Sequence, residues 1–110
     1  MQRELASDLE RAVERLAAQF HPQRIVLFGS QARGTADPRS DVDLLVIMHF
    51  EKRPGARRDR MVAIDRALRG LHLACDIVIL TQEEYERDRW IPGTIARPAS
   101  REGKVLYEAA

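Results

Sequence analysis

A glycine-serine pair at the end of an apolar run is the first feature of the sequence that could do chemistry. Residues 25–28 are apolar, and Gly29 and Ser30 follow them directly. Such a pair after a buried strand forms a tight loop whose backbone can approach a ligand closely. Amides at the start of a following helical turn, expected over Ser30 to Gly34, would point at the same place. These features predict a phosphate-binding loop.

Three carboxylates stand at or near the start of the next two apolar runs. Asp41 and Asp43 precede residues 44–48, and Asp76 lies near the start of a third run. Side chains alternate along a strand, so Asp41 and Asp43 point to one face. A carboxylate buried alone would cost several kcal/mol or take up a proton. If the second and third strands are neighbours, the three carboxylates can converge on a hard divalent cation such as Mg²⁺.

Carboxylates that hold a metal beside a phosphate-binding loop are typical of the active sites that catalyse phosphoryl or nucleotidyl transfer. Each signal also has a simpler interpretation. The Gly-Ser pair can be an ordinary strand-to-helix connection, and the Asp-x-Asp pair a solvated strand entrance. Asp76 can cap a loop, and Arg33 can form a surface ion pair of little energetic value. The joint occurrence of all these features favours the transfer chemistry.

Alternating helical and strand patterns predict the elements that position these residues. Apolar residues at helical spacing, cap residues and Pro-Gly breaks define the helices, and short apolar runs define the strands. The expected strands are Arg24 to Phe28, Asp41 to Phe50, Leu73 to Leu80 and an edge strand, Lys104 to Glu108. The expected helices are Arg3 to Phe20, one with Met61, Ile64, Leu68 and Leu71 on its inner face, one from the cap Thr81 to about Trp90, and Thr94 to Arg101. We therefore expect an α/β (α+β) fold.

The composition predicts one domain over residues 1–110, with 45% hydrophobic and 32% charged residues. A net charge of +1 gives no general attraction to nucleic acid or membrane, so we expect neither as a direct partner. The single cysteine, Cys75, suits a reducing compartment. No apolar run approaches the ~20 residues that a bilayer requires, and the N-terminus lacks an apolar signal core. The expected location is the cytoplasm.

Three segments together resemble the DNA polymerase beta-like nucleotidyltransferase superfamily. They are Gly29-Ser30-x-Ala32-Arg33-Gly34, Ser40-Asp41-x-Asp43-Leu44-x-Val46, and Asp76 heading an apolar strand. More narrowly, the chain is similar to the minimal nucleotidyltransferases that are antitoxin partners of HEPN-domain toxins. Its ending, Arg101 to Glu108, is typical of these short proteins. The resemblance implies a small mixed β-sheet flanked by helices.

The resemblance also implies a role for each matching residue. Asp41, Asp43 and Asp76 would be catalytic and would ligate two Mg²⁺ ions, with Asp76 at the metal that activates the acceptor hydroxyl. The remaining implied ligand-binding residues are Gly29 and Ser30 at the β and γ phosphates, and Arg33 and Ser40 in support of the loop or the triphosphate.

The implied reaction is attack of an acceptor hydroxyl on the α-phosphate of ATP, with release of pyrophosphate. We expect no helical second domain of the kind that larger relatives carry, and therefore a protein acceptor, which the resemblance suggests is a tyrosine of a HEPN-type toxin. Two alternatives stay open: a non-catalytic antitoxin that acts by occlusion, and a small-molecule transferase of the aminoglycoside type with a helical partner subunit. Candidate contact surfaces are Trp90-Ile91-Pro92, unless Trp90 is a core residue, and Lys52 to Arg60, unless this is a solvated charge run.

Overall fold

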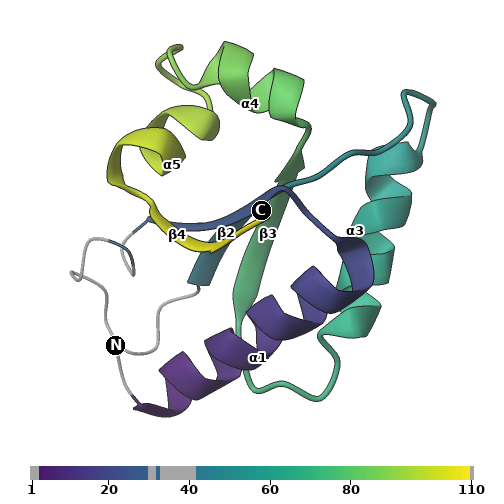
Figure 1. The fold of residues 1–110 in the computed structure, drawn as a ribbon, viewed down its shortest axis with the longest axis vertical. Coiled ribbons are helices and arrows are strands. Elements are labelled where there is room, and N and C mark those ends of the chain that lie inside the picture. Colours follow the sequence, from purple (N-terminus) through teal and green to yellow (C-terminus); the bar gives the residue numbers. More distant parts are fainter. Residues whose placement is uncertain (1–2, 30–31, 33–41, 110) are drawn as a thin grey trace.

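The computed structural model describes residues 3–29, 32 and 42–109, and its strands form one sheet with helices on both faces (Figure 1). The chain belongs to the α/β (α+β) class that its sequence predicts. The strands are β1 (Arg24–Phe28), β2 (Val42–Ile47), β3 (Cys75–Leu80) and β4 (Lys104–Glu108). The helices are α1 (Arg3–Phe20), α3 (Ala56–Ala67), α4 (Gln82–Asp88) and α5 (Ala96–Glu102).

The sheet is mixed, with the strand order β3-β2-β1-β4. Strand β1 is antiparallel to β2 and to β4, whereas β2 and β3 are parallel. The starts of β2 and β3 therefore lie at the same end of the sheet as the end of β1. Gly29 follows the end of β1, and Asp43 and Asp76 are the second residues of β2 and β3, so the topology brings these three residues to one end of the sheet.

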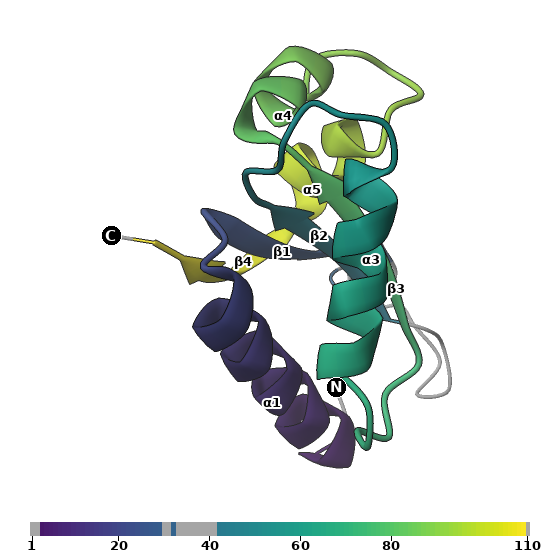
Figure 2. The same ribbon diagram turned by 90° about the vertical axis from the view of Figure 1, so that its right-hand side faces the viewer.

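Helices cover the two faces of the sheet in pairs, with α1 and α3 on one face and α4 and α5 on the other (Figure 2). Alternate residues of β1, β2 and β3 pack into two separate cores. Leu44 and Val46 of β2 pack into the core under α1 and α3, together with Leu16 and Ile64 of these helices. The core under α4 and α5 contains Val26, Phe28, Leu45, Ile47, Tyr85, Ala96 and Ala99. Strands β1 and β2 are thus buried on both faces, which explains their nearly continuous apolar sequences.

The predicted boundaries need correction in five elements. Helix α4 ends at Asp88 and not at about Trp90, and α5 spans Ala96–Glu102 rather than Thr94 to Arg101. Strand β2 ends at Ile47 and not at Phe50, and β3 begins at Cys75 and not at Leu73. Each strand continues only while its neighbour offers backbone partners, and the last of these bonds joins Met48 N–H to Leu80 O at 3.0 Å. Helix α3 ends at Ala67, so both Leu68, its C-cap, and Leu71 lie beyond it. The predicted helical turn over residues 30–34 lies outside the described residues, apart from Ala32.

No helix in the described part of the chain combines the length and the apolar character needed to cross a membrane.

Arg15 of α1 joins the two helices that cover one face of the sheet. Its guanidinium donates hydrogen bonds to Ala67 O at 3.1 Å and to Arg69 O at 2.9 Å. These carbonyls lie at the C-terminal end of α3, where a cation also interacts favourably with the helix dipole.

Replacing Arg15 by Met is expected to lower the free energy of unfolding by about 1 kcal/mol, because the two carbonyls lose a charged donor. Urea denaturation measures this loss. Arg11→Met is the matched control. Among the described residues, Arg11 forms an ion pair with Asp8 alone, at 3.8 Å on the same helix, and such a surface pair is expected to contribute less than about 0.5 kcal/mol. Equal losses in both variants would contradict the proposed cap.

Candidate functional site

Asp43 and Asp76 stand side by side on neighbouring strands. They are direct partners in the parallel register of β2 and β3, so their backbones lie about 4.8 Å apart. The expected adjacency of the second and third strands is confirmed. Residues in register on parallel strands point to the same face, and the structure therefore places these two carboxyl groups on one face of the sheet.

That face is the one covered by α4 and α5. Leu45 and Ile47 follow Asp43 at alternate positions of β2, and Val78 and Leu80 follow Asp76 in β3. All four pack in the core beneath α4 and α5. Asp43 and Asp76 therefore lie on the same face as these four apolar residues, at the starts of β2 and β3.

Gly29 lies against the carboxyl group of Asp43. Phe28, the last residue of β1, is the antiparallel partner of Asp43, and Gly29 follows it with φ of +76°. A Cβ placed on Gly29 would collide with Asp43 Oδ2 and would lie 3.3 Å from Asp43 Cγ. Both the left-handed backbone and the close approach require glycine at this position. The structure thus brings the glycine of the predicted loop into contact with one of the predicted metal ligands.

The expectation that the aspartates are buried needs a correction. Asp43 is half-buried, whereas Asp76 is exposed. Strand β3 forms an edge of the sheet, so solvent reaches the start of this strand from the side. The cost of desolvating a carboxylate therefore does not apply to Asp76. The unfavourable energy of the pair is the repulsion between the two carboxylates.

Four of the predicted site residues lie outside the described residues, namely Ser30, Arg33, Ser40 and Asp41. Among the residues that the structure does describe, no group of three or more acidic, histidine or cysteine side chains could hold a metal ion. The described part of the site is therefore Gly29, Asp43 and Asp76. Carboxylate oxygens in register on neighbouring strands suit a hard divalent cation such as Mg²⁺.

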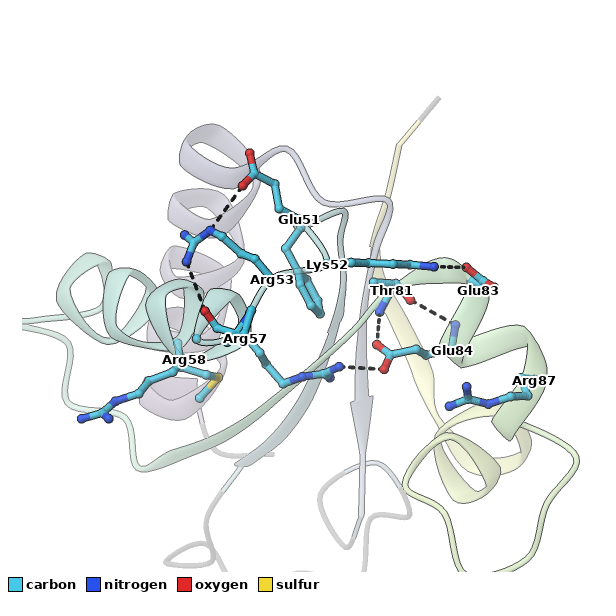
Figure 3. A pocket seen from close by; sticks show the side chains of 13 residues that line it. Glu51, Lys52, Arg53, Arg57, Arg58, Thr81, Glu83, Glu84 and Arg87 are labelled. Atoms are coloured by element: carbon cyan, nitrogen blue, oxygen red, sulfur yellow. Dashed lines mark hydrogen bonds and ion pairs between the residues drawn. The ribbon is translucent and has the colours of Figure 1, made fainter.

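A cleft of about 850 Å³ lies at the other end of the sheet, where β2 and β3 end (Figure 3). Its walls are the connection from Phe50 to Gly55, the first turn of α3 and the start of α4. Figure 3 shows that its charged side chains pair across the opening, with Lys52 on Glu83 at 3.4 Å and Arg57 on Glu84 at 2.6 Å.

The charges of the cleft largely cancel within the protein. Arg53 is paired with Glu51 and Asp59, and Arg87 is paired with Asp88. Arg57 also donates to Ile79 O and lies 4.8 Å from the centre of the Phe50 ring. In the predicted contact surface over Lys52 to Arg60, Lys52 and Arg57 thus pair with α4, and Arg53 pairs with carboxylates close to it in sequence.

Thr81 begins α4 with a capping box. Its hydroxyl accepts a hydrogen bond from Glu84 N–H at 3.1 Å, and the Glu84 carboxylate accepts one from Thr81 N–H at 2.9 Å. The cap predicted from the sequence is confirmed. Partial burial alone would raise the pKa of Glu84, but the hydrogen bonds from Thr81 and Arg57 outweigh it and lower the pKa below its ordinary value of 4.5.

Thr81→Ala is expected to lower the free energy of unfolding by about 1 kcal/mol, and Thr81→Ser, which keeps the hydroxyl, by much less. Because the pKa of Glu84 is lowered in the folded state, its carboxylate contributes fully to the free energy of unfolding above its ordinary pKa of 4.5. This contribution is lost as the pH falls through the folded-state pKa. The difference in free energy of unfolding between wild type and Glu84→Gln, which removes the charge that the Thr81 N–H and Arg57 stabilise, should therefore shrink in acid. Urea denaturation at several pH values tests this, and a difference that grows as the pH falls would contradict the capping role.

Trp90 and Ile91 are exposed, in the connection between α4 and α5, with 67% and 45% of their surfaces accessible. The alternative that Trp90 is a core residue is therefore wrong. Pro92 is exposed as well. Ile95 was not predicted to belong to this surface but is 43% exposed; the Pro-Gly break before it was the only signal in the sequence.

Comparison with known proteins identifies the class that this fold and site define. The family model described as "Nucleotidyltransferase domain" matches residues 9–99. The chain belongs to this nucleotidyltransferase domain family. No curated protein is significantly similar to the chain in sequence.

Two solved structures share the fold. One is a presumed nucleotidyltransferase from Sulfolobus solfataricus, with 23% identity and a TM-score of 0.66, over 94% of this chain and 80% of that one. The other belongs to a toxin-antitoxin complex with AMP-PNP, with 21% identity and a TM-score of 0.58, over 98% of this chain and 75% of that one. Both likenesses agree with the mixed sheet and its flanking helices.

Proposed function

We propose that this protein is a Mg²⁺-dependent nucleotidyltransferase that transfers AMP from ATP to a protein hydroxyl, a tyrosine of a HEPN-type toxin, and so acts as an antitoxin. The observation that carries the proposal is the contact between Gly29 and Asp43, with Asp76 in register beside Asp43. A phosphate loop and a carboxylate pair at this spacing suit phosphoryl-transfer chemistry. Membership of the nucleotidyltransferase domain family supports the same reaction class.

The predicted site residues take these roles in the proposal. Gly29 and Ser30 bind the β and γ phosphates of ATP, with Arg33 and Ser40 in support. Asp41, Asp43 and Asp76 hold Mg²⁺, which when bound offsets the charge of the carboxylates and the triphosphate. We propose that residues 1–110 form a single catalytic domain and that it works in the cytoplasm, where ATP is available.

The proposed reaction breaks one bond and forms one. The acceptor oxygen bonds to the α-phosphorus of ATP, and the bond from that phosphorus to the pyrophosphate oxygen breaks. Asp76 receives the proton of the acceptor hydroxyl, which its exposed position at the sheet edge allows. Gly29, without a Cβ, lets the phosphates approach the carboxyl group of Asp43.

A first test separates metal binding from transfer. In metal-free buffer Asp76→Asn is expected to raise the melting temperature by about 2–4 °C, because two like charges in register repel each other. Mg²⁺ is expected to stabilise wild type and to leave this variant unchanged. Thermal melts with EDTA or Mg²⁺ measure both effects, and equal stabilisation of the two proteins by Mg²⁺ would contradict a role of Asp76 as a ligand.

The function itself is tested by mixing the protein with ATP, Mg²⁺ and the co-encoded HEPN-domain protein, whose intact mass is then measured. A gain of one or more adenylyl groups, absent with Asp41→Asn or Asp43→Asn, is the expected result. Tryptic mapping should place each group on a tyrosine. Neutralisation of the toxin that survives both substitutions, with no change in mass, would overturn the enzymatic proposal and leave the occlusion mechanism.

A further inference from the structure

We propose that residues 90–95, together with Arg97 and Arg101 of α5, form the docking surface for the acceptor protein, and that the acceptor meets it with an apolar patch bordered by carboxylates. This inference rests on the proposed function, since it assumes that the acceptor is a protein.

Three large apolar side chains are exposed within these six residues. Trp90, Ile91 and Ile95 are 67%, 45% and 43% accessible. Contiguous exposed apolar side chains of this size mark interaction sites, and tryptophan is prominent among the residues that contribute most to binding. The Trp90 ring also lies 5.1 Å from the Arg89 guanidinium, which holds one side of the ring.

The backbone of this segment is fixed by hydrogen bonds of its own. The Thr94 hydroxyl shares its one proton between Asp88 O at 2.7 Å and Ile91 O at 2.8 Å, and Ile91 N–H donates to Asp88 O at 2.9 Å. A preorganised loop loses less conformational entropy when it binds a partner. The apolar side chains are therefore displayed by a defined turn.

The position of the segment connects it with the acidic pair. It joins α4 to α5, and these helices cover the sheet face to which Asp43 and Asp76 point (Figure 1). A protein bound there would lie on the same face of the sheet as the two carboxyl groups, toward the end at which β3 leads into α4. The apolar groove of about 440 Å³ beside α1, lined by Leu9, Val13 and Leu106, lies on the opposite face.

Unbalanced positive charge beside the apolar residues indicates the charge of the partner. Each carboxylate of α4 is paired with a cation: Glu83 with Lys52, Glu84 with Arg57, Glu86 with Arg89, and Asp88 with Arg87. Arg97 and Arg101 of α5 have no ion pair with any residue of the described part of the chain. They are one helical turn apart, on the same side of α5. Acceptor carboxylates would complement them.

Trp90, as the only tryptophan of the chain, reports directly on docking. We would label this protein with 5-hydroxytryptophan, which can be excited apart from any tryptophan of the partner, and titrate it with the purified co-encoded HEPN-domain protein. The expected result is a blue shift of the Trp90 emission as the ring leaves water. Calorimetry should show about 30-fold weaker binding by Trp90→Ala, and the KM for the acceptor should rise by a similar factor.

Ile95→Ser and Val62→Ser form a matched pair, because both side chains are 43% exposed while Val62 lies on α3, over the opposite sheet face. The proposal is supported if Ile95→Ser weakens binding of the acceptor and Val62→Ser does not. It is also supported if Arg97→Glu weakens binding and this effect is larger at low salt. Circular dichroism confirms that each variant is folded. If the acceptor is bound and adenylylated with no emission shift and no loss in Trp90→Ala, the docking surface is overturned and the proposed function stands. If wild type neither binds nor modifies the acceptor, both proposals fail.

Discussion

Substitution of Asp43 by Asn is expected to lower the rate of adenylyl transfer about 10³-fold or more, the scale on which loss of a charged group from a phosphoryl-transfer site acts. Asparagine keeps the shape of the side chain and its contact with Gly29, but it removes the negative charge that the proposed Mg²⁺ site requires. The loss should appear mainly in kcat. Single-turnover transfer to the acceptor protein, followed by intact mass, measures it.

Asp65→Asn is the control for charge removal, because Asp65 is an exposed residue of α3 on the other side of the sheet. It should transfer at the wild-type rate. Thermal melting should show that Asp43→Asn is folded. A variant that keeps more than about a tenth of the wild-type rate would contradict the role of Asp43 as a metal ligand.

Gly29→Ala is expected to reduce the free energy of unfolding by about 2–4 kcal/mol and to reduce transfer as well. Two causes act together. Gly29 has φ of +76°, which costs energy for any other residue, and the new methyl group would collide with Asp43 Oδ2. The collision should displace the carboxyl group from the sheet end. Urea denaturation and the transfer assay measure the two effects.

A glycine with the same strain but open surroundings separates these causes. Gly70 has φ of +87°, and no atom lies within 4 Å of the place that a Cβ on this residue would occupy, so Gly70→Ala should cost only about 1–2 kcal/mol. In an Asp43→Ala background, where the colliding atoms are gone, the loss in free energy of unfolding caused by Gly29→Ala should decrease to the value expected for Gly70→Ala. A Gly29→Ala cost that does not change in that background would show that the Asp43 contact has no part in it.

Local patterns were sufficient to predict most of the secondary structure. The apolar periodicity of α1 and the caps and breaks around α4 act over a few residues, and the bounds predicted for α1, β1 and β4 agree with the structure. The ends of β2 and β3 were wrong because strand ends depend on where the neighbouring strand stops offering hydrogen bonds, and this is a long-range property.

For the candidate site, the sequence by itself determined which residue types are available: a glycine at the end of one strand and aspartates at the starts of two others. Only the tertiary structure decided that Asp43 and Asp76 lie in register, that Gly29 touches Asp43, and that Asp76 is exposed. It also decided that Trp90 lies at the surface. The physical reason is that register, contact and burial arise from segments far apart in the chain, whereas periodicity and capping are complete within one or two turns.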